Sequence, residues 1–440
     1  MKAGDILRVE IERLAPNGSG AVTVEERDVL VAGAAPGDHV EIRVDSVSRQ
    51  HPRAFASLRT ATRSEAFRKP PCHHAAPTMG DCGGCPIMHV DDEAQLEAKA
   101  QWVNAALGDI GWVDGVIASN ESLAYRNRSN FFVWRSTAGV IRLGSRVPGG
   151  EGFAKMDGCR ILAEPLDQIA SDIASKANEM EVPVGRGPGA LRYVGLRSDR
   201  HGRVLVEFVT FGEADVLVRR LGAAVYNASD HVVGFVESKN TSTGNAVRLK
   251  RAKAVLGKDS LVDEVAGVPI QLWSDTFAQL NWETAEHMAS RVAELAFSDS
   301  GPIWDIYSGV GVLGLAAAAK GGRKVLSAEV TSSAVDGARE AARKMGIEGR
   351  FEVIDLRSGL PGDWEQPGTV IVNPPRKGLH RSLVRRIAAT GAPIIYMSCN
   401  PQSFAADATK LIEAGRKLEL VEAYDMLPQT AHVELLARFI

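Results

Sequence analysis

From about residue 283 onward the chain alternates apolar strands with helices, and this alternation constrains the fold more than any other feature of the sequence. The apolar runs are PIWDIYSG, KVLSAEV, RFEVIDL, GTVIVNPP and PIIYMSCNP, and segments of helical periodicity separate them. Strands that are apolar on both faces and are joined by helices are typical of a mostly parallel sheet covered on both sides. The sequence therefore predicts an α/β fold for residues 273–440.

Polar residues and glycines gather where these predicted strands end. Ligands of parallel sheets bind beyond the carboxyl ends of the strands, so we expect these residues to share one cleft. They are Asp305, Gly309, Glu329, Asp355, Asn373 and Cys399.

A glycine-rich turn, Gly309-x-Gly311-x-x-Gly314, follows the first of these strands and would let a nucleotide approach the backbone. The motif alone does not separate dinucleotide enzymes, methyltransferases and plain tight turns. Glu329, at the end of the next strand, is either a ligand for both hydroxyls of a ribose or a solvated acid. The Asn373-Pro-Pro sequence favours a methyltransferase over a dehydrogenase, because two prolines rigidly aim backbone carbonyls and the Asn amide at a substrate base.

The first 272 residues lack this alternation. Residues 1–62 hold short alternating strands separated by PNGSG and AAPGD, which predicts a small antiparallel barrel. Such a barrel suits oligonucleotide binding, although many small barrels bind nothing of the kind. Residues 63–272 combine short strands such as NFFVWR and GRVLVEFVTF with helices at 91–107 and near 166–179, so we predict a middle α+β domain.

The five cysteines divide into a group of four and a single residue. An odd number of cysteines in a reducing compartment argues against a disulfide framework. Cys82-Gly-Gly-Cys85 is a metal-binding type of pair, with Cys72 shortly before it and Cys159 later in the chain. Four thiolates would bind zinc or an iron–sulfur cluster. Alternatively, Cys159 is a buried packing residue and His73 or His74 completes a zinc site. Either reading leaves Cys399 unpaired.

Charge and hydropathy narrow the setting. The net charge of −3 does not by itself indicate a nucleic-acid partner. Two segments are nevertheless locally basic: residues 40–70 and residues 121–160 each hold seven Lys or Arg and three acidic residues. The amino terminus is charged throughout, and the longest weakly polar run, residues 310–319, is too short to span a bilayer. We therefore expect a cytoplasmic protein, a monomer without a membrane partner.

The combined motifs resemble the RNA uracil-5 methyltransferases, most closely the iron–sulfur-containing branch that acts on 23S rRNA. The resemblance covers nearly the whole chain. It is carried by C…CGGC with the later DGC, AYRNRSNF, TFAQLNW, DIYSGVG, SAEV, NPPRKGL, MSCNP and AHVELLARF. It implies a class I, Rossmann-like methyltransferase domain at residues 273–440, a TRAM-like RNA-binding barrel at 1–62 and a middle domain at 63–272 with the Cys-rich loop.

The resemblance also implies roles for individual residues. A [4Fe-4S] cluster would be held by Cys72, Cys82, Cys85 and Cys159. S-adenosylmethionine would be contacted by Gln279, Tyr307, Gly309, Glu329, Asp355 and Asn373. Cys399 falls on the catalytic nucleophile and Glu434 on the base. Most of the family has Asp at the position of Asn373 and many members have Asn at that of Val312, and the spacing from Cys72 to Cys82 is longer than usual.

The chemistry of uracil explains why one thiol and one carboxylate are needed. C5 of uracil is too electron-poor to attack a methyl sulfonium until a thiolate adds to C6 and forms an enolate. C5 then takes the methyl group, a base removes its proton and the thiol is expelled. Cys399, at a strand end before Asn-Pro, is placed for the first role, whereas the alternative is an inert packing thiol. Glu434 lies among apolar neighbours, where burial would raise its pKa toward that of a useful base, although by itself it could be a solvent-side acid.

The expected partner is RNA, with 23S rRNA favoured and tRNA open. Because the target uridine must leave its stack, an aromatic or Arg surface is expected beside the cleft. Arg126, Arg128, Arg376 and Lys377 are candidates for holding phosphates, or else ordinary surface charges. The alternative from another class is an RNA-binding factor that has lost catalysis, for which Asn373 would be the first sign.

Overall fold

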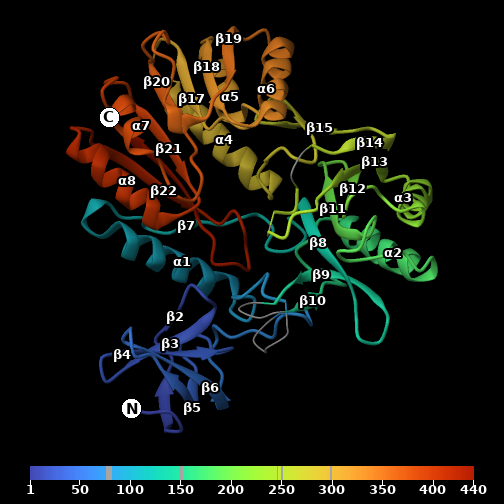
Figure 1. The fold of residues 1–440 in the computed structure, drawn as a ribbon. Coiled ribbons are helices and arrows are strands. Elements are labelled where there is room, and N and C mark those ends of the chain that lie inside the picture. The colour runs from blue at the N-terminus through green and yellow to red at the C-terminus, as the bar shows by residue number, and fades with distance from the viewer. Residues whose placement is uncertain (76–81, 148–151, 245, 249–250, 298–299) are drawn as a thin grey trace.

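The computed structural model describes residues 1–75, 82–147, 152–244, 246–248, 251–297 and 300–440. Three larger sheets organise these residues (Figure 1): an amino-terminal sheet at the bottom of the view, a seven-stranded sheet at the right and an eight-stranded sheet at the top left. A two-stranded sheet of β15 (Leu261–Val265) and β16 (Val268–Leu272) is added to them. None of the described helices is long and apolar enough to cross a membrane.

Six strands form the amino-terminal sheet, in the order β1-β5-β6-β4-β3-β2. They are β1 (Ile6–Glu10), β2 (Arg13–Leu14), β3 (Ser19–Val24), β4 (Arg27–Ala32), β5 (His39–Val47) and β6 (Arg53–Thr62). Their apolar side chains make a small core of their own. The prediction of purely antiparallel pairing is wrong at one place: β4 and β6 are parallel. The reason is that β5 and β6 pair as an antiparallel hairpin that brings β6 back beside β4.

The seven-stranded sheet has the order β10-β9-β8-β11-β12-β13-β14. Its strands are β8 (Arg128–Arg135), β9 (Ile141–Arg146), β10 (Phe153–Lys155), β11 (Leu191–Ser198), β12 (Val204–Thr210), β13 (Val232–Lys239) and β14 (Lys253–Gly257). Helices α2 (Leu166–Glu179) and α3 (Val216–Ala228) contribute apolar side chains to a core shared with these strands. The helix expected near residues 166–179 is confirmed.

The eight-stranded sheet has the order β19-β18-β17-β20-β21-β23-β22-β7. Its strands are β7 (Val116–Ile117), β17 (Ile303–Ile306), β18 (Val325–Glu329), β19 (Gly349–Val353), β20 (Thr369–Val372), β21 (Ile394–Ser398), β22 (Leu418–Tyr424) and β23 (Glu434–Phe439). The five strands from β19 to β21 are parallel, and β23 runs antiparallel between β21 and β22. This is the mostly parallel sheet that the apolar runs predict.

Helices cover this sheet on both faces, and each face has a separate core. On one face lie α4 (Trp282–Ala296), α5 (Val312–Gly321) and α6 (Ser332–Met345). On the other lie α7 (Arg381–Ala388) and α8 (Pro401–Glu413). Short 3-10 turns at Gly108–Ile110 and Leu356–Ser358 complete the regular structure of the described residues.

Two segments that precede residue 273 pack on this large sheet. Helix α1 (Asp92–Leu107) places Val103 and Leu107 in the same core as Trp304 and Ile306. Strands β15 and β16 contribute their apolar faces to the core around α4, α5 and α6. The packing therefore does not follow the domain boundary predicted at residue 272. Apolar residues from both sides of that boundary are buried in the same cores.

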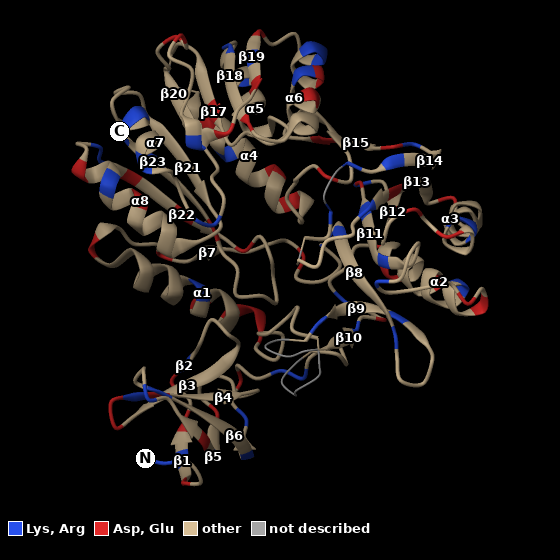
Figure 2. Ribbon diagram, in the orientation of Figure 1, with Lys and Arg blue, Asp and Glu red and all other residues tan. Residues whose placement is uncertain are grey.

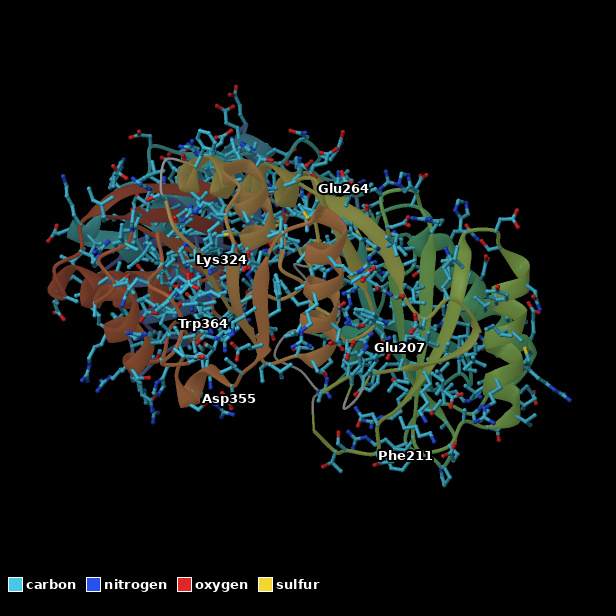
Figure 3. All side chains as sticks on the ribbon, turned by 90° about the horizontal axis from the view of Figure 1, so that it is seen from above. Glu207, Phe211, Glu264, Lys324, Asp355 and Trp364 are labelled. Atoms are coloured by element: carbon cyan, nitrogen blue, oxygen red, sulfur yellow. The ribbon has the colours of Figure 1, made fainter. Side chains whose placement is uncertain are left out.

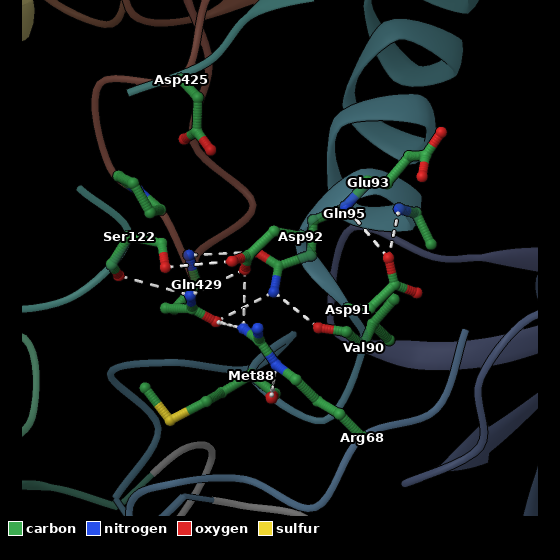
Figure 4. A network of polar contacts seen from close by, with 12 residues as sticks. Arg68, Met88, Val90, Asp91, Asp92, Glu93, Gln95, Ser122, Asp425 and Gln429 are labelled. Atoms are coloured by element: carbon green, nitrogen blue, oxygen red, sulfur yellow. Dashed lines mark hydrogen bonds and ion pairs between the residues drawn. The ribbon is translucent and has the colours of Figure 1, made fainter. Parts of the chain in front are cut away.

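A buried polar network joins α1 to the segment before β23 (Figure 4). Gln429 is fully buried, and its side-chain oxygen accepts hydrogen bonds from Arg68 (2.6 Å) and Gln95 (2.9 Å). Nearby, the Lys99 ammonium forms a 2.6 Å ion pair with Asp425, and both side chains are buried. Residues 425–433 are thus held from the amino-terminal half of the chain.

Candidate active site

Cys399 lies in the junction between β21 and α8. Strand β21 ends at Ser398, and the Asn400 side chain caps α8 by accepting a hydrogen bond from the backbone N–H of Gln402 (3.2 Å). Pro401 stands in the first turn, where its missing N–H costs nothing. Because strand and helix meet in this way, Cys399 lies at the carboxyl edge of the sheet, half-buried, as its sequence position predicts.

Glu434 faces this cysteine from the neighbouring strand. Strand β23 pairs antiparallel with β21, and Ser398 lies opposite Leu435, so the next step of the register brings Glu434 beside Cys399. The Glu434 Oε2 atom is buried and has no hydrogen-bond partner among the described residues. Burial raises the pKa of Glu434 to about 7, against the opposing effect of the nearby Arg376 charge. Burial, followed by the Glu434 charge, raises the pKa of the Cys399 thiol.

Arg376 completes this group. Its guanidinium donates a hydrogen bond to the Cys399 thiol and contacts the His432 ring, at 2.7 Å from Nδ1 and 3.2 Å from Nε2. The Arg376 carbonyl accepts a hydrogen bond from the Asn400 side chain (3.0 Å), which ties the loop after β20 to the loop that carries Cys399. Sequence reasoning missed His432, although it stands in the AHVELLARF motif, and it treated Arg376 only as a candidate for holding phosphate.

The glycine turn after β17 has the shape that the sequence predicts. Both Gly309 and Gly311 have positive φ, and a Cβ on Gly314 would lie 2.5 Å from the Asp305 carboxylate. The Glu329 carboxylate accepts hydrogen bonds from the backbone N–H groups of Gly309 (3.1 Å) and Thr331 (2.8 Å). Glu329 therefore holds the turn in place while it retains lone pairs for another donor.

Asp305 supports the same turn from below. Its Oδ2 atom accepts a hydrogen bond from the Gly314 N–H (3.1 Å), and its Oδ1 atom is buried without a partner among the described residues. Burial raises the pKa of Asp305 to about 7. Because it is fully buried beneath the turn, Asp305 supports the glycine loop and does not line an open site.

A cavity of about 480 Å³ opens at the carboxyl ends of β17 to β20. Tyr307, which has a positive φ of 62°, lies on one wall, and the segment after Pro375 lies on another. The full lining is Tyr307, Val330, Ile354, Asp355, Leu356, Arg357, Pro375, Lys377, Gly378, Leu379 and His380. A cavity therefore lies at the expected edge of the sheet, but Asp355 is the only member of its lining among the six residues expected to share a cleft.

Asp355 lines this cavity, whereas Asn373 is not part of its lining. Asp355 lies on the side of the large sheet, away from Glu207 and Phe211 of the seven-stranded sheet (Figure 3). The Arg357 guanidinium pairs with Asp355 and lowers the pKa of that carboxyl to about 2. Asn373, directly after β20, donates its backbone N–H to the Ile306 carbonyl (3.2 Å) and is half-buried.

The loop that carries Gln279 is held by the seven-stranded sheet. Arg128 donates to the carbonyls of Ser274 (2.6 Å) and Thr276 (3.0 Å), and Asn127 donates to the Gln279 carbonyl (2.9 Å). Burial lowers the pKa of Arg128 to about 10. The expectation that Arg128 holds RNA phosphate is therefore wrong, because its donors are used on backbone carbonyls. Phe277 in this loop exposes 62% of its surface, and is an aromatic residue that sequence reasoning did not single out.

Four cysteines converge at the edge of the seven-stranded sheet. The pKa of the Cys85 thiol is raised by burial and then by the proximity of Cys159, Cys82 and Cys72, so the four sulfur atoms share one neighbourhood. Burial raises the pKa of Cys159 to about 11. The Cys159 backbone N–H is held by Asp167 (2.9 Å). Arg126, expected to contact RNA, lies near Cys85, where its charge opposes the raised pKa of that thiol.

The two histidines beside Cys72 form a separate group. His73, His74 and Asp157 place possible ligand atoms within 4.8 Å of one another, and no cysteine belongs to this group in the described part of the chain. The His74 Nε2 atom lies 2.8 Å from an Asp157 carboxylate oxygen. The alternative of a zinc site completed by a histidine therefore has candidate residues, but His74 pairs with Asp157 and neither histidine is grouped with a thiol among the described residues.

Comparison with known proteins identifies the relatives of this fold and site. The family model described as tRNA (Uracil-5-)-methyltransferase matches residues 349–437, which include Asn373, Cys399 and Glu434. An uncharacterised RNA methyltransferase of Caldanaerobacter subterraneus subsp. tengcongensis is 31% identical over 99% of this chain and 98% of its own length. The chain belongs to the uracil-5 RNA methyltransferase family. A similar relative from Gloeobacter violaceus is 30% identical over 99% of this chain and 96% of its own.

A solved member of the family has the same architecture. The crystal structure of the Pyrococcus abyssi tRNA (uracil-54, C5)-methyltransferase with S-adenosyl-L-homocysteine matches with a TM-score of 0.79 and 28% identity, over 98% of this chain and 99% of that one. The family resemblance and the Rossmann-like methyltransferase fold predicted from the sequence are thereby confirmed. The protein is an RNA methyltransferase that uses S-adenosylmethionine.

Proposed function

We propose that this protein forms 5-methyluridine in RNA, with Cys399 as the nucleophile and Glu434 as the base. The observation that carries the proposal is the juxtaposition of the two side chains, Cys399 directly after β21 and Glu434 at the start of the adjacent strand β23, at the edge of the sheet where the cavity of about 480 Å³ opens. A single reactive thiol and a single carboxylate are what methylation of C5 requires.

The two residues act at different stages. The Cys399 thiolate adds to C6 of uracil, which makes C5 nucleophilic. S-adenosylmethionine, when bound, supplies the methyl group. Glu434 then takes the proton from C5, the electron pair of that C–H bond restores the C5–C6 double bond, and the sulfur atom leaves C6 as thiolate. A carboxyl group with a pKa of about 7 is matched to proton removal near neutral pH.

The cofactor is proposed to bind across the carboxyl ends of β17 to β20. Tyr307 and Asp355 line the cavity there, and the Gly309 turn with its Glu329 carboxylate adjoins it. Gln279 would approach from the loop that Arg128 supports, and Asn373 from the loop after β20. The seven-stranded sheet would thereby contribute to cofactor binding through one anchored loop.

We propose that the four cysteines hold a [4Fe-4S] cluster, and the mutual effect of their thiols on the pKa of Cys85 supports their proximity. Four thiolates around one zinc ion at about 2.3 Å would lie about 3.8 Å apart, whereas no three of the described thiols lie within 4.8 Å of one another. Cys72, Cys82, Cys85 and Cys159 would be the ligands, and the cluster would tie the Cys-rich loop to the segment after β10. We expect a brown, iron-containing protein after purification without air, and a colourless zinc-containing one would contradict this.

The RNA substrate has two candidates. We favour 23S rRNA on the resemblance to the iron–sulfur-containing rRNA branch, with residues 1–62 as a TRAM-like RNA-binding unit. A tRNA is the second candidate, because the matching Pyrococcus abyssi enzyme is a tRNA (uracil-54, C5)-methyltransferase. Lys and Arg are spread over all three larger sheets (Figure 2), so either RNA could contact more than one of them.

One experiment tests the function and separates the substrates. Purified protein is incubated with methyl-labelled S-adenosylmethionine and, separately, with unmodified 23S rRNA and unmodified tRNA, and the nucleosides are analysed by mass spectrometry. We expect 5-methyluridine in one pool and none with Cys399→Ala. If S-adenosylmethionine binds and neither RNA is methylated, the reading of a non-catalytic RNA-binding factor replaces this proposal.

A further inference from the structure

Arg376 has an unusual set of neighbours for an exposed arginine. Its guanidinium lies between the Cys399 thiol, to which it donates a hydrogen bond, and the His432 ring at 2.7 Å. Its charge also acts on the buried Glu434 carboxyl. The adjoining residue, Lys377, lines the cavity instead and has no part in this group.

Cys399 and Glu434 are two groups of potential negative charge close together, and a nearby cation would stabilise their charged forms. Cys399 and Glu434 would both act as anions, and the Glu434 charge disfavours ionisation of the Cys399 thiol, because two negative charges close together repel. Burial opposes ionisation of both as well. A fixed positive charge beside both groups favours the two anionic forms at once.

His432 is suited to fix that charge in place. Burial of part of the ring, together with the Arg376 charge, lowers the pKa of His432 to about 4, so the ring is neutral near pH 7. A neutral imidazole nitrogen accepts a hydrogen bond from a guanidinium, whereas a protonated one would repel it. The Asn400 side chain holds the Arg376 backbone from the other side.

We propose that Arg376 is a catalytic residue that serves as the shared counter-charge of Cys399 and Glu434, that His432 is its positioning residue, and that neither serves mainly as an anchor for RNA phosphate. The inference rests on the proposed function. Before attack, the thiol loses its proton to solvent and the guanidinium faces the thiolate. Once the S–C6 bond has formed, the sulfur atom is neutral and the guanidinium faces the Glu434 carboxylate, which then accepts the C5 proton.

The pH dependence of thiol alkylation tests the inference without RNA or cofactor. The rate of Cys399 alkylation by iodoacetamide is measured between about pH 6 and about pH 10 by mass spectrometry of the peptide that contains it, since only the thiolate displaces iodide. Iodoacetamide is uncharged, so the guanidinium does not attract it. Besides Arg376 and His432, the charged or titratable groups around this thiol are Glu434 on β23 and Tyr396 on β21, with Asp407 of α8 behind Tyr396.

We expect Arg376→Gln to slow alkylation about tenfold below the pKa of the thiol and to move the profile to higher pH. Arg376→Lys should retain part of the effect, and His432→Ala should cause a smaller shift in the same direction. Lys377→Gln is the matched control, because it removes a neighbouring charge outside the group; its profile should stay within about twofold of that of the wild type.

Two results would overturn the inference. One is an Arg376→Gln profile that superposes on that of the wild type while RNA affinity falls, which would make Arg376 a phosphate anchor. The other is an equal shift with Lys377→Gln, which would make the effect one of general surface charge. Because alkylation needs no substrate, a shift with Arg376→Gln in a protein that methylates neither RNA pool would support the effect of Arg376 on the Cys399 thiol and would contradict the proposed function.

Discussion

Cys399 and Cys85 are the same residue type with raised pKa values, but their neighbours differ. Both are half-buried, but Cys399 stands at a strand end and accepts a hydrogen bond from the Arg376 guanidinium, whereas Cys85 has three other thiols close by and the charge of Arg126 opposes them. A neighbouring cation favours a thiolate that is free to react, while burial among like groups disfavours any thiolate unless a metal compensates the charge. The comparison teaches that the neighbours, and not the cysteine, separate a nucleophile from a ligand.

Replacement of the nucleophile should have the largest effect, and it tests whether Cys399 and Cys85 have different roles. We expect Cys399→Ala to lower methylation by about a thousandfold or more, because covalent activation of C5 has no substitute in the site. Its iron content and thermal unfolding should match those of the wild type. Nucleoside mass spectrometry, iron analysis and thermal denaturation check the three points, and residual methylation within tenfold of the wild type would exclude Cys399 as nucleophile.

The complementary change affects the other cysteine. Cys85→Ser should lose most of the bound iron and lower the unfolding temperature, by about 1 °C for each kcal/mol lost if the 440 residues unfold together. Alkylation of Cys399 in this variant should keep its wild-type pH profile. Iron and zinc analysis with calorimetry measures the first effect. Full iron content in Cys85→Ser would remove this thiol from the cluster.

The pH dependence of methylation sharpens the role of Glu434. Because its pKa is raised to about 7, we expect the rate to fall about tenfold per pH unit below pH 7, and Glu434→Gln to abolish turnover.

The control for the Glu434 prediction is the pH dependence of unfolding. A raised pKa in the folded state gives stability that is complete below about pH 4.5 and is lost as pH rises through 7. Glu434→Gln should therefore unfold with a free energy higher by at most about 3 kcal/mol above pH 7. A rate that is flat from pH 5 to 8 would contradict this assignment.

The smallest expected effect isolates the mutual influence of nucleophile and base. In Glu434→Gln the negative charge beside Cys399 is absent, so alkylation of Cys399 near pH 8 should be about threefold faster than in the wild type. Alkylation of Cys85 in the iron-loaded protein should not change. An unchanged rate at Cys399 would mean that the two groups titrate independently.

The parts of the site that depend on backbone patterning could be predicted from the sequence. The apolar strands and the glycine turn predicted the parallel sheet and the cavity at the carboxyl ends of its strands. The Asn-Pro sequence after Cys399 predicted that the thiol lies at a strand end. The contacts of long side chains could not be predicted in this way, since an arginine reaches several directions from one backbone position. Arg128 proved to bind loop carbonyls, and the partnership of Arg376 with His432 joins residues from separate loops. The two-residue strand β7 was also too short to leave a pattern.

The buried network around Gln429 bears on whether the catalytic part can exist alone. The segment that leads into Glu434 includes Asp425 and Gln429, whose partners Lys99 and Gln95 belong to α1. A fragment that starts at residue 273 would leave Asp425 without its counter-ion, and loss of one partner from a buried pair costs about 3 to 5 kcal/mol. We therefore expect insertions, deletions and truncations in the segments that connect the sheets to be tolerated only where α1 is kept. The sequence pattern suggests separate consecutive domains. The folded catalytic part nevertheless includes α1 as well as residues after 273, so it is discontinuous in sequence.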